Sequence, residues 1–258
     1  MKQPLVIKTT DQLRQWRKQQ HGNVGFVPTM GALHQGHASL LSQSCMENEL
    51  TVLSIYVNPT QFNNPQDLEK YPQTWDKDCQ IAAENKVDVI FAPQYSDIYF
   101  DQYRYKIQES SESRILCGAH RPGHFDGVLT IVMKLFQLVK PTRAYFGEKD
   151  FQQLRLIQGL VKSFFLDVQI IPVPTRREED GLAMSSRNLR LNEEQRKKAP
   201  MIFQTLQNSK TASDVQNELN KLGLAIDYVE DHWNRRFIAA TLGDVRLIDN
   251  VEIQGEPT

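Results

Sequence analysis

PTMGALHQGH, residues 28–37, is the stretch that decides the fold. It follows a short apolar run, 24–27, that predicts a buried strand, and it precedes an amphipathic run, 38–46, that predicts a helix. Such a turn can bind an anion, because the first N–H groups of a helix are unpaired and the helix dipole has its positive end at the N-terminus. Two histidines three residues apart are expected on one face of a helical turn, where both can grip a phosphate, and Gly36 leaves room for the ligand. The stretch predicts nucleotide phosphate chemistry.

The bulk composition excludes several classes of protein. The chain has 258 residues, 40% hydrophobic and 24% charged, which suits one large or two smaller globular domains. A net charge of -1 gives no basic field for nucleic acid, no apolar run could span a bilayer, and the N-terminal residues lack the apolar core of a signal peptide. Cys45, Cys79 and Cys117 are widely spaced, which favours free thiols in a reducing compartment. These features predict a cytoplasmic enzyme that binds neither nucleic acid nor membrane.

Strand-like and helix-like runs alternate through the first two-thirds of the chain. The expected strands are 24–27, 51–57, 88–91, 144–146 and 168–173, and the expected helices are 38–48, 74–85, 127–139, 151–165 and 193–207. This alternation predicts an α/β fold with a parallel sheet and crossover helices. After Thr175 the sequence pattern changes. A charged loop is followed by helical patterns and then by short expected strands at 225–233, 236–241 and 245–248. We therefore expect two domains, 1–175 and a smaller α+β domain at 176–258.

Three polar loops follow three of the expected strands. In a parallel sheet, ligands bind at the carboxyl ends of the strands. The loop 58–62 carries Asn58 and Gln61, and their amides, with that of Gln153, suit a small substrate with hydroxyls and a carboxylate. In the loop 147–150, Lys149 can neutralise phosphate charge. In isolation, each motif is more typical of an ordinary turn or helix cap.

Two further loops carry cations suited to anionic ligands. The hydroxyls of Ser185 and Ser186 with the Arg187 guanidinium suit a triphosphate, although a helix cap with a surface arginine is the alternative. Arg121, at the start of a loop with two glycines and a proline, can reach a carboxylate or a phosphate. His34 and His37 have the spacing of zinc ligands, but no third ligand stands at a recognisable spacing. The absence of P-loop and GxGxxG motifs disfavours Walker-type hydrolysis and dinucleotide redox chemistry.

Together these motifs resemble a known family. PTMGALHQGH resembles the HxGH signature of the nucleotidyltransferase superfamily, which includes class I aminoacyl-tRNA synthetases, and MSSRN resembles that superfamily's KMSKS loop. The ordered segments YVNPTQF, RPGHFDGV, KLF, FGEKDFQQL, DGLAMSSRN and RLIDN are similar to those of pantoate–β-alanine ligases (pantothenate synthetases). The resemblance extends from about residue 5 to 250. Two residues depart from the family pattern, Gln73 where arginine is usual and Phe100 where proline is common.

The resemblance implies a fold and a reaction. The first domain, 1–175, would be a Rossmann-like domain that binds ATP and pantoate, and 176–258 would be a small lid. Pantoate and ATP would give pantoyl adenylate and pyrophosphate, and the amine of β-alanine would then release pantothenate and AMP. Mg²⁺ would be held largely by the triphosphate oxygens, without a dedicated protein metal site. The resemblance also implies a homodimer.

It also implies roles for individual residues. His34 and His37 would hold the ATP phosphates, with His37 as the proton donor, and Lys149, Ser185, Ser186 and Arg187 would stabilise phosphate charge. The full set of implied ATP contacts is Met30, Gly31, Ala32, Leu33, His34, Gln35, Gly36, His37, Gly147, Glu148, Lys149, Asp150, Arg176, Met184, Ser185, Ser186 and Arg187. Gln61 would be shared by pantoate and β-alanine, and Gln153 would be the other pantoate contact. Asn58 and Arg121 complete the expected substrate contacts.

Two alternatives stay open at the level of sequence. A cytidylyl- or adenylyltransferase shares HxGH but transfers the nucleotide to a phosphate, and the paired amides Gln61 and Gln153 favour an acyl substrate instead. A nucleotide-sensing protein without catalysis would be expected to have degraded loops. Here His34, His37 and Lys149 are all present, which favours an enzyme.

Overall fold

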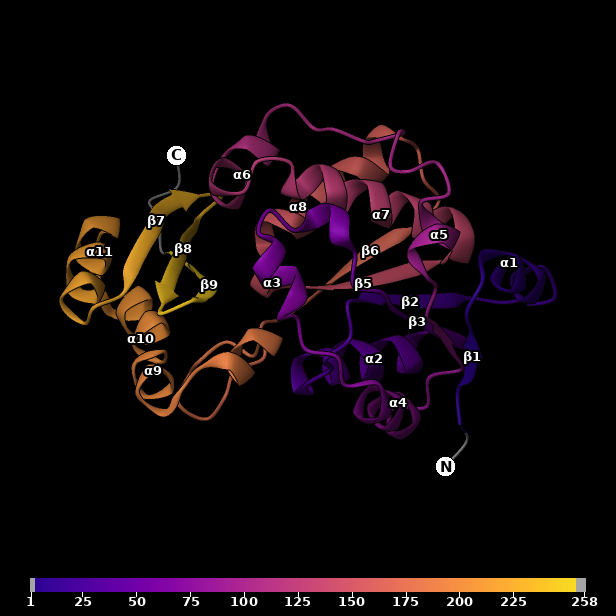
Figure 1. Cartoon of the computed structure of the whole chain (residues 1–258), viewed down its shortest axis with the longest axis horizontal. Coiled ribbons are helices and arrows are strands. Elements are labelled where there is room, and N and C mark those ends of the chain that lie inside the picture. Colours follow the sequence, from indigo (N-terminus) through magenta and orange to yellow (C-terminus); the bar gives the residue numbers. More distant parts are fainter. Residues whose placement is uncertain (1–2, 254–258) are drawn as a thin grey trace.

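A six-stranded parallel sheet forms the centre of the molecule in the computed structural model, which describes residues 3–253 (Figure 1). The strand order is β1-β4-β3-β2-β5-β6. The bounds are β1 (Leu5–Ile7), β2 (Val24–Thr29), β3 (Leu50–Ile55), β4 (Val89–Phe91), β5 (Arg143–Gly147) and β6 (Gln169–Val173). The five predicted strands are confirmed. Three-residue β1 was missed because so short a run gives no periodic signal.

The strand order places a switch point beside β2. From β2 the chain moves outward to β3 and β4 on one side, and later through β5 to β6 on the other. In open α/β sheets, ligands bind in the crevice at such a point, outside the carboxyl ends of the strands. The stretch 28–37 leaves the sheet at this position.

Helices cover both faces of the sheet. On one face lie α2 (Gln35–Glu47) and α4 (Trp75–Glu84), and on the other lie α1 (Thr10–Lys18), α7 (His124–Val139) and α8 (Phe151–Ser163) (Figure 1). Successive strand residues point to opposite faces, so Phe26 packs in the core under α7 and its neighbour Val27 in the core under α2. The remaining helical segments are α3 (Pro65–Glu69), α5 (Tyr95–Ile98), α6 (Cys117–His120) and the 3-10 turns Pro59–Gln61, Glu112–Arg114, Glu148–Asp150 and Ser186–Arg190.

A smaller α+β domain follows β6, as predicted. It contains the antiparallel sheet β7-β8-β9 and three helices, with bounds α9 (Glu193–Lys198), α10 (Met201–Asn208), α11 (Ala212–Lys221), β7 (Ala225–His232), β8 (Arg235–Leu242) and β9 (Val245–Glu252). The single helix expected over 193–207 is wrong, because the chain forms two helices there. Pro200 has no N–H to continue the first helix and instead begins the second.

The central strand of the small sheet, β8, is buried on both faces. On β8, Ile238 and Ala240 pack with the helices of their own domain, whereas Phe237 and Ala239 join the core of the large domain. Alternation along one strand thus fastens the two domains together.

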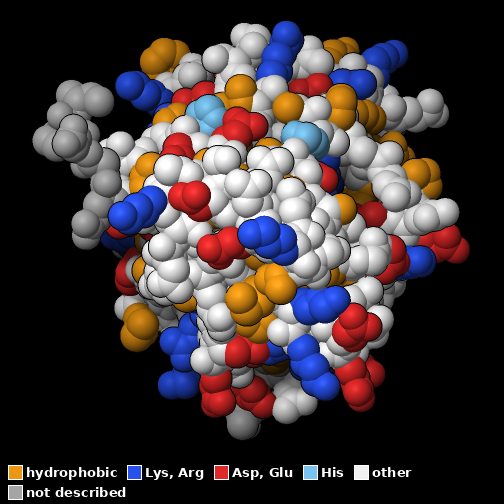
Figure 2. Space-filling model, turned by 90° about the vertical axis from the view of Figure 1, so that its left-hand side faces the viewer, with side chains coloured by type: hydrophobic (Ala, Val, Ile, Leu, Met, Phe, Trp, Pro, Cys, Tyr) orange, Lys and Arg blue, Asp and Glu red, His pale blue; other side chains and the backbone are white. Residues whose placement is uncertain are grey.

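On the face that the small domain presents, acidic and basic side chains are interspersed (Figure 2). No helix within residues 3–253 is long and apolar enough to cross a membrane.

Candidate active site

The stretch 28–37 folds into a capped turn at the end of β2. His34 is the N-cap of α2, with extended backbone angles (φ -140°, ψ 179°), so it stands just before the helix, and the two histidines lie on one face as expected. The Nδ1 atom of His34 accepts a hydrogen bond from Gly36 N–H at 3.1 Å, and the Nδ1 atom of His37 accepts one from His34 N–H at 3.4 Å. This capping box brings the two rings to 4.1 Å between centroids.

Both histidines are neutral at physiological pH. Burial, with the positive charge of Lys149 next, lowers the pKa of His34 to about 4. Burial, followed by the neighbouring His34 and Lys149, holds the pKa of His37 well below its ordinary value. Because each Nδ1 accepts a backbone hydrogen bond, the ring proton of each neutral imidazole resides on Nε2. Both residues line the same cavity, so each has an Nε2–H donor for a ligand there.

Asp78 of α4 holds the turn from behind. Its carboxylate accepts hydrogen bonds from Ala32 N–H (3.0 Å) and Leu33 N–H (2.7 Å) and is fully buried. Gly31 adopts φ +79°, and a Cβ atom there would stand 2.9 Å from the same carboxylate. The turn therefore needs glycine at this position for both conformation and space.

The end of β3 positions an amide. Asn58 is buried, and its Nδ2 donates to the Oε1 atom of Gln61 (2.9 Å) and to the carbonyl of Gly127. Its Oδ1 accepts from Tyr99 and Thr60, so all of its hydrogen-bonding capacity is used within the protein. With Oε1 of Gln61 occupied, the Nε2–H₂ group of that residue is left to donate to a ligand.

Buried His124 and partly buried Arg121 hold the backbone beside this amide. The carbonyl oxygen of Gln61 accepts hydrogen bonds from Nδ1 of His124 (2.8 Å) and from Nη2 of Arg121 (3.2 Å). Nε2 of His124 then accepts from Arg121 Nη1 at 3.2 Å. Burial, with Arg121 next, lowers the pKa of His124 to about 3, which agrees with a neutral ring that accepts from a guanidinium.

The end of β5 supplies the cation Lys149. The small domain secures its loop, because Nδ2 of Asn250 on β9 donates to the carbonyl oxygens of Glu148 and Lys149, both at 3.0 Å. The ammonium of Lys149 lies 3.8 Å from the Asp150 carboxylate. Gln153 follows within α8 and lines the same cavity as the histidines.

The MSSRN loop comes from the start of the small domain. Ser185 caps a 3-10 turn by accepting from Arg187 N–H, and Ser186 is buried, with its hydroxyl 3.2 Å from that of Tyr71. The guanidinium of Arg187 donates to Asp67 of α3 at 2.8 Å. This loop is therefore joined to the large domain across the cavity.

These segments enclose one cavity of about 240 Å³. The predicted site residues that line it are Met30, His34, Gly36, His37, Asn58, Gln61, Arg121, Gly147, Lys149, Asp150, Gln153, Arg176, Met184, Ser185, Ser186 and Arg187. The predicted ATP contacts that do not line it are Gly31, Ala32, Leu33, Gln35 and Glu148. Asp78 already occupies the N–H groups of Ala32 and Leu33, so those two support the turn from outside the cavity.

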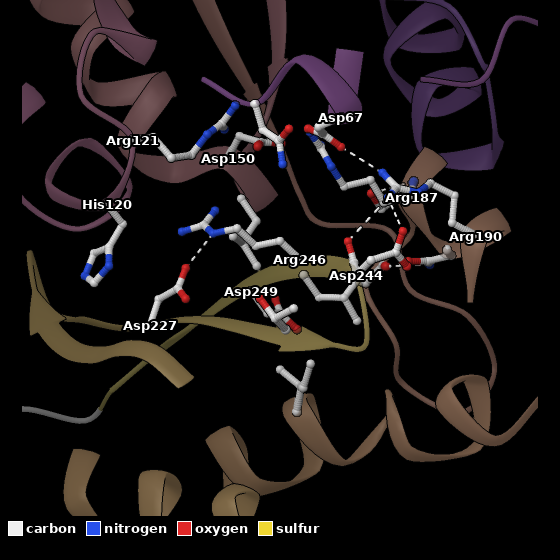
Figure 3. A pocket seen from close by; sticks show the side chains of 18 of the residues that line it. Asp67, His120, Arg121, Asp150, Arg187, Arg190, Asp227, Asp244, Arg246 and Asp249 are labelled. Atoms are coloured by element: carbon white, nitrogen blue, oxygen red, sulfur yellow. Dashed lines mark hydrogen bonds and ion pairs between the residues drawn. The ribbon is translucent and has the colours of Figure 1, made fainter. Parts of the chain in front are cut away.

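A second cavity, of about 300 Å³, adjoins the first and lies between the two domains (Figure 3). Charged side chains of both signs line it, and Arg121, Lys149 and Arg187 border both cavities. The sequence does not predict this second cavity. Its walls come from α3, α6 and the small sheet, and no sequence motif links these segments.

Sequence reasoning missed several residues that hold the site together. Asp67, Tyr71 and Asp78 support the loops from α3, α4 and the segment between them, and Asn250 does so from β9. The RLIDN motif gave a signal for Asn250 without a role. The others carry no local pattern that separates them from ordinary helix residues.

Comparisons with known proteins agree with this geometry. The chain matches the family described as Pantoate-beta-alanine ligase over residues 5–252. The chain belongs to this family. A pantothenate synthetase of Bdellovibrio bacteriovorus is 63% identical over 96% of this chain and 99% of its own length, and one of Legionella pneumophila is 53% identical over 88% and 90%.

Solved structures extend the match to three dimensions. A pantoate-beta-alanine ligase from Francisella tularensis, complexed with beta-gamma ATP and beta-alanine, has a TM-score of 0.94 at 42% identity and covers 99% of this chain and 100% of its own. A pantothenate synthetase of Thermus thermophilus has a TM-score of 0.88 at 38% identity, covering 96% and 99%. As a member of this ligase family, the chain is an enzyme that condenses pantoate with β-alanine at the expense of ATP.

Proposed function

We propose that the first cavity catalyses the condensation in two steps, the first of which forms pantoyl adenylate. A carboxylate oxygen of pantoate attacks the α-phosphorus of ATP, and the bond from that phosphorus to pyrophosphate breaks. The Nε2–H groups of His34 and His37, with Lys149 and Arg187, donate to the phosphate oxygens as negative charge develops on them. The backbone of Arg176 and the residues 184–186 lie where the rest of the nucleotide would be held.

The paired amides bind pantoate in this proposal. Gln61 presents Nε2–H₂ because Asn58 occupies its oxygen, and Gln153 faces the same space from α8. Both can donate to the carboxylate or the hydroxyls of pantoate. Asn58 then acts as a positioning residue rather than a direct contact, which refines its predicted role.

In the second step, the amine of β-alanine attacks the carbonyl carbon of the adenylate. The carbon–oxygen bond to AMP breaks, the amide bond of pantothenate forms, and the nitrogen releases one proton. No residue of the chain becomes covalently attached, so the protein contributes position and charge.

The observation that carries this proposal is the pair of neutral, Nε2–H histidines facing the amides and Lys149 across one cavity. The test is pantoate-dependent exchange of labelled pyrophosphate into ATP without β-alanine, together with AMP release when β-alanine is added. Release of ADP, or exchange that does not depend on pantoate, would contradict it.

We infer that Mg²⁺ enters with the nucleotide. Residues 3–253 contain no group of three or more histidine, cysteine, aspartate or glutamate side chains placed to hold a metal. The cavity offers the carboxylate of Asp150 as one oxygen ligand, which suits a cation whose other ligands are triphosphate oxygens and water. Bound in this way, Mg²⁺ would neutralise phosphate charge.

We further infer a homodimer that forms through the β6 edge of the sheet. β6 is an edge strand, and the adjoining Phe164 and Phe165 are 53% and 94% exposed. Light scattering should give twice the chain mass, and Phe165→Asp should give monomers. Phe100→Asp, at another exposed phenylalanine, is the matched control and should leave the dimer intact. A monomeric wild type, or a dimer insensitive to Phe165→Asp, would contradict this surface.

The proposal also includes a role for the small domain and a cellular compartment for the enzyme. Residues 176–258 would act as a lid, supported by the loop 184–188 and β9, which reach the site from that side. The enzyme would work in the cytoplasm, a setting supported by Cys45, Cys79 and Cys117, which are free thiols in the structure.

A further inference from the structure

The RLIDN motif, residues 246–250 in β9, contributes no group to the proposed reaction. Two of its side chains, Asp249 and Asn250, are nevertheless polar and buried. In the antiparallel pair with β8, Asp249 lies opposite Ile238 and Asn250 lies opposite Phe237. Paired residues share a face of the sheet, so Asp249 faces the core of the small domain and Asn250 faces the large domain.

Asn250 holds the lysine loop, residues 147–150. Its Nδ2 donates to the carbonyl oxygens of Glu148 and Lys149, both at 3.0 Å. Its Oδ1 accepts from Nε of Arg235 at 2.7 Å, which fixes the orientation of the amide so that its NH₂ group faces those carbonyls. The backbone of the lysine loop is thereby attached to β9.

Residues 176–184 form a hairpin whose two ends line the first cavity. Met184 N–H donates to the carbonyl oxygen of Arg176 at 2.9 Å, so these two residues lie side by side. A Cβ atom on Gly36 would stand 3.7 Å from that of Met184, so the hairpin ends against the histidine turn. A small displacement of the hairpin would therefore change the space left for the nucleotide.

Asp249 fixes this hairpin through Arg177. Its carboxylate accepts from both terminal nitrogens of the guanidinium, at 2.6 and 3.0 Å. Nη1 of Arg177 also donates to the carbonyl of Gly181 in the turn of the hairpin, and the guanidinium lies 3.6 Å from the ring centroid of Phe203 in α10. A planar fork held by two carboxylate oxygens and an aromatic face has little freedom to move. The position of the hairpin therefore depends on β9.

We propose that Asp249 and Asn250 are positioning residues that hold the hairpin and the lysine loop at a fixed distance from each other. The N–H group of Asn250 donates to Oδ1 of Asp249 at 2.8 Å, so the two anchors also restrain each other. Lys149 then meets the phosphates while the hairpin receives the rest of the nucleotide. This inference rests on the proposed two-step reaction.

The test measures the KM for ATP and the KM for pantoate in the pyrophosphate-exchange assay. Asp249→Asn leaves one acceptor for the guanidinium, and Arg177→Met removes the guanidinium without leaving a charge unpaired. Either change should raise the KM for ATP about tenfold, because the hairpin loses its fixed position, and should leave the KM for pantoate within about twofold of wild type. The double variant should be no worse than the more impaired single variant, because both changes break one contact.

Asp231→Asn is the matched control in the same domain. Asp231 accepts two hydrogen bonds from buried Arg236, at 2.8 and 2.9 Å, and Arg236 in turn holds the carbonyls of Ser209 and Lys210, which line neither cavity. The control should lower the urea midpoint, as Asp249→Asn does, and keep the wild-type KM for ATP. An equally raised KM for ATP in the control would reduce the effect of Asp249 to stability and overturn the proposal.

Asn250→Asp tests the other anchor, since a carboxylate cannot donate to the two carbonyl oxygens. It should lower kcat for exchange by about 10–30-fold and change the KM for ATP less, because a displaced Lys149 stabilises the transition-state charge poorly. Asn250→Ser, which retains one donor and adds no charge, should lose less of kcat. Wild-type kcat in both variants would refute the role of Asn250.

The readouts separate this inference from the proposed function. If wild type shows no pantoate-dependent exchange, the two-step reaction itself fails. Given exchange, a wild-type KM for ATP in Asp249→Asn and Arg177→Met would overturn the role of Asp249. Circular dichroism identifies the folded variants, and Arg177→Met carries the test if Asp249→Asn does not fold.

Discussion

The two segments that we propose to bind the phosphates are held in different ways. The turn 28–37 is fixed by local hydrogen bonds among its own residues and by hydrogen bonds to buried Asp78. The loop 184–188 comes from the other domain and is tied to Asp67 through the partly exposed Arg187. The first segment is therefore built by packing and is in place before a ligand binds. The second has one buried hydrogen bond to the large domain, between Ser186 and Tyr71, and depends otherwise on long-range ion pairs, which water and salt weaken.

The largest effect is expected at the packed turn itself. His37→Ala removes an Nε2–H donor that stabilises the developing phosphate charge, so pyrophosphate exchange should slow by about 10²–10³-fold. The urea midpoint should change little, because His37 contributes one capping bond. Unchanged exchange by a folded variant would contradict the role of this histidine. His37→Gln, which can place a donor near the same point, should recover part of the rate.

Asp78→Asn tests whether the turn depends on its buried support. An amide offers one acceptor where the carboxylate accepts two N–H groups, and its own NH₂ faces the remaining donor. We expect unfolding free energy to fall by about 2–3 kcal/mol in urea titrations, with weaker exchange activity. Asp76→Asn, on the same helix, should be close to wild type. Equal stability of the two variants would show that Asp78 does not hold the turn.

His124→Asn tests how buried His124 holds the backbone at Gln61. The pKa of His124 is about 3 in the folded state against 6.5 when exposed. The unfolded chain therefore binds the proton first, and stability is lost as pH falls below 6.5. At pH 5 this amounts to about 2 kcal/mol relative to pH 8. Asparagine keeps a donor to the Gln61 carbonyl without titrating, so its stability should fall less by that amount.

The matched control for this pH profile is His21→Asn, at an exposed histidine, which should follow wild type. A His124→Asn profile as steep as that of wild type would mean that other groups cause the acid sensitivity.

The smallest effect is expected where ion pairs hold the loop. Burial would raise the pKa of Asp67, but Arg187 and Arg190 hold it below its ordinary value. Because these groups are partly exposed, Asp67→Asn should cost under about 1 kcal/mol of stability. It should also free Arg187 for the triphosphate and lower the KM for ATP by about two- to fivefold at low salt. A raised KM would show instead that Asp67 positions Arg187.

The sequence predicted the parallel sheet because buried strands and crossover helices have distinct periods. It also predicted the site loops, because parallel strands end at one edge. The sequence did not predict β1, because three residues are too few to show a periodic pattern. The single helix predicted over 193–207 was wrong because the effect of Pro200 was overlooked. His34 was expected at a strand-to-helix turn and lies there, but the sequence did not predict that its ring caps the helix, because local backbone hydrogen bonds decide this.

The sequence by itself determined the chemistry of this protein. The histidines, amides and cations stand in short motifs, and these groups meet as long as the fold keeps the ends of the strands together. The tertiary structure alone decided how those groups are supported and charged. Burial keeps the imidazoles of His34, His37 and His124 uncharged, and partners far along the chain, Asp78 and Asn250, fix the loops. Burial and long-range hydrogen bonds arise only when distant segments pack, so no local pattern in the sequence records them.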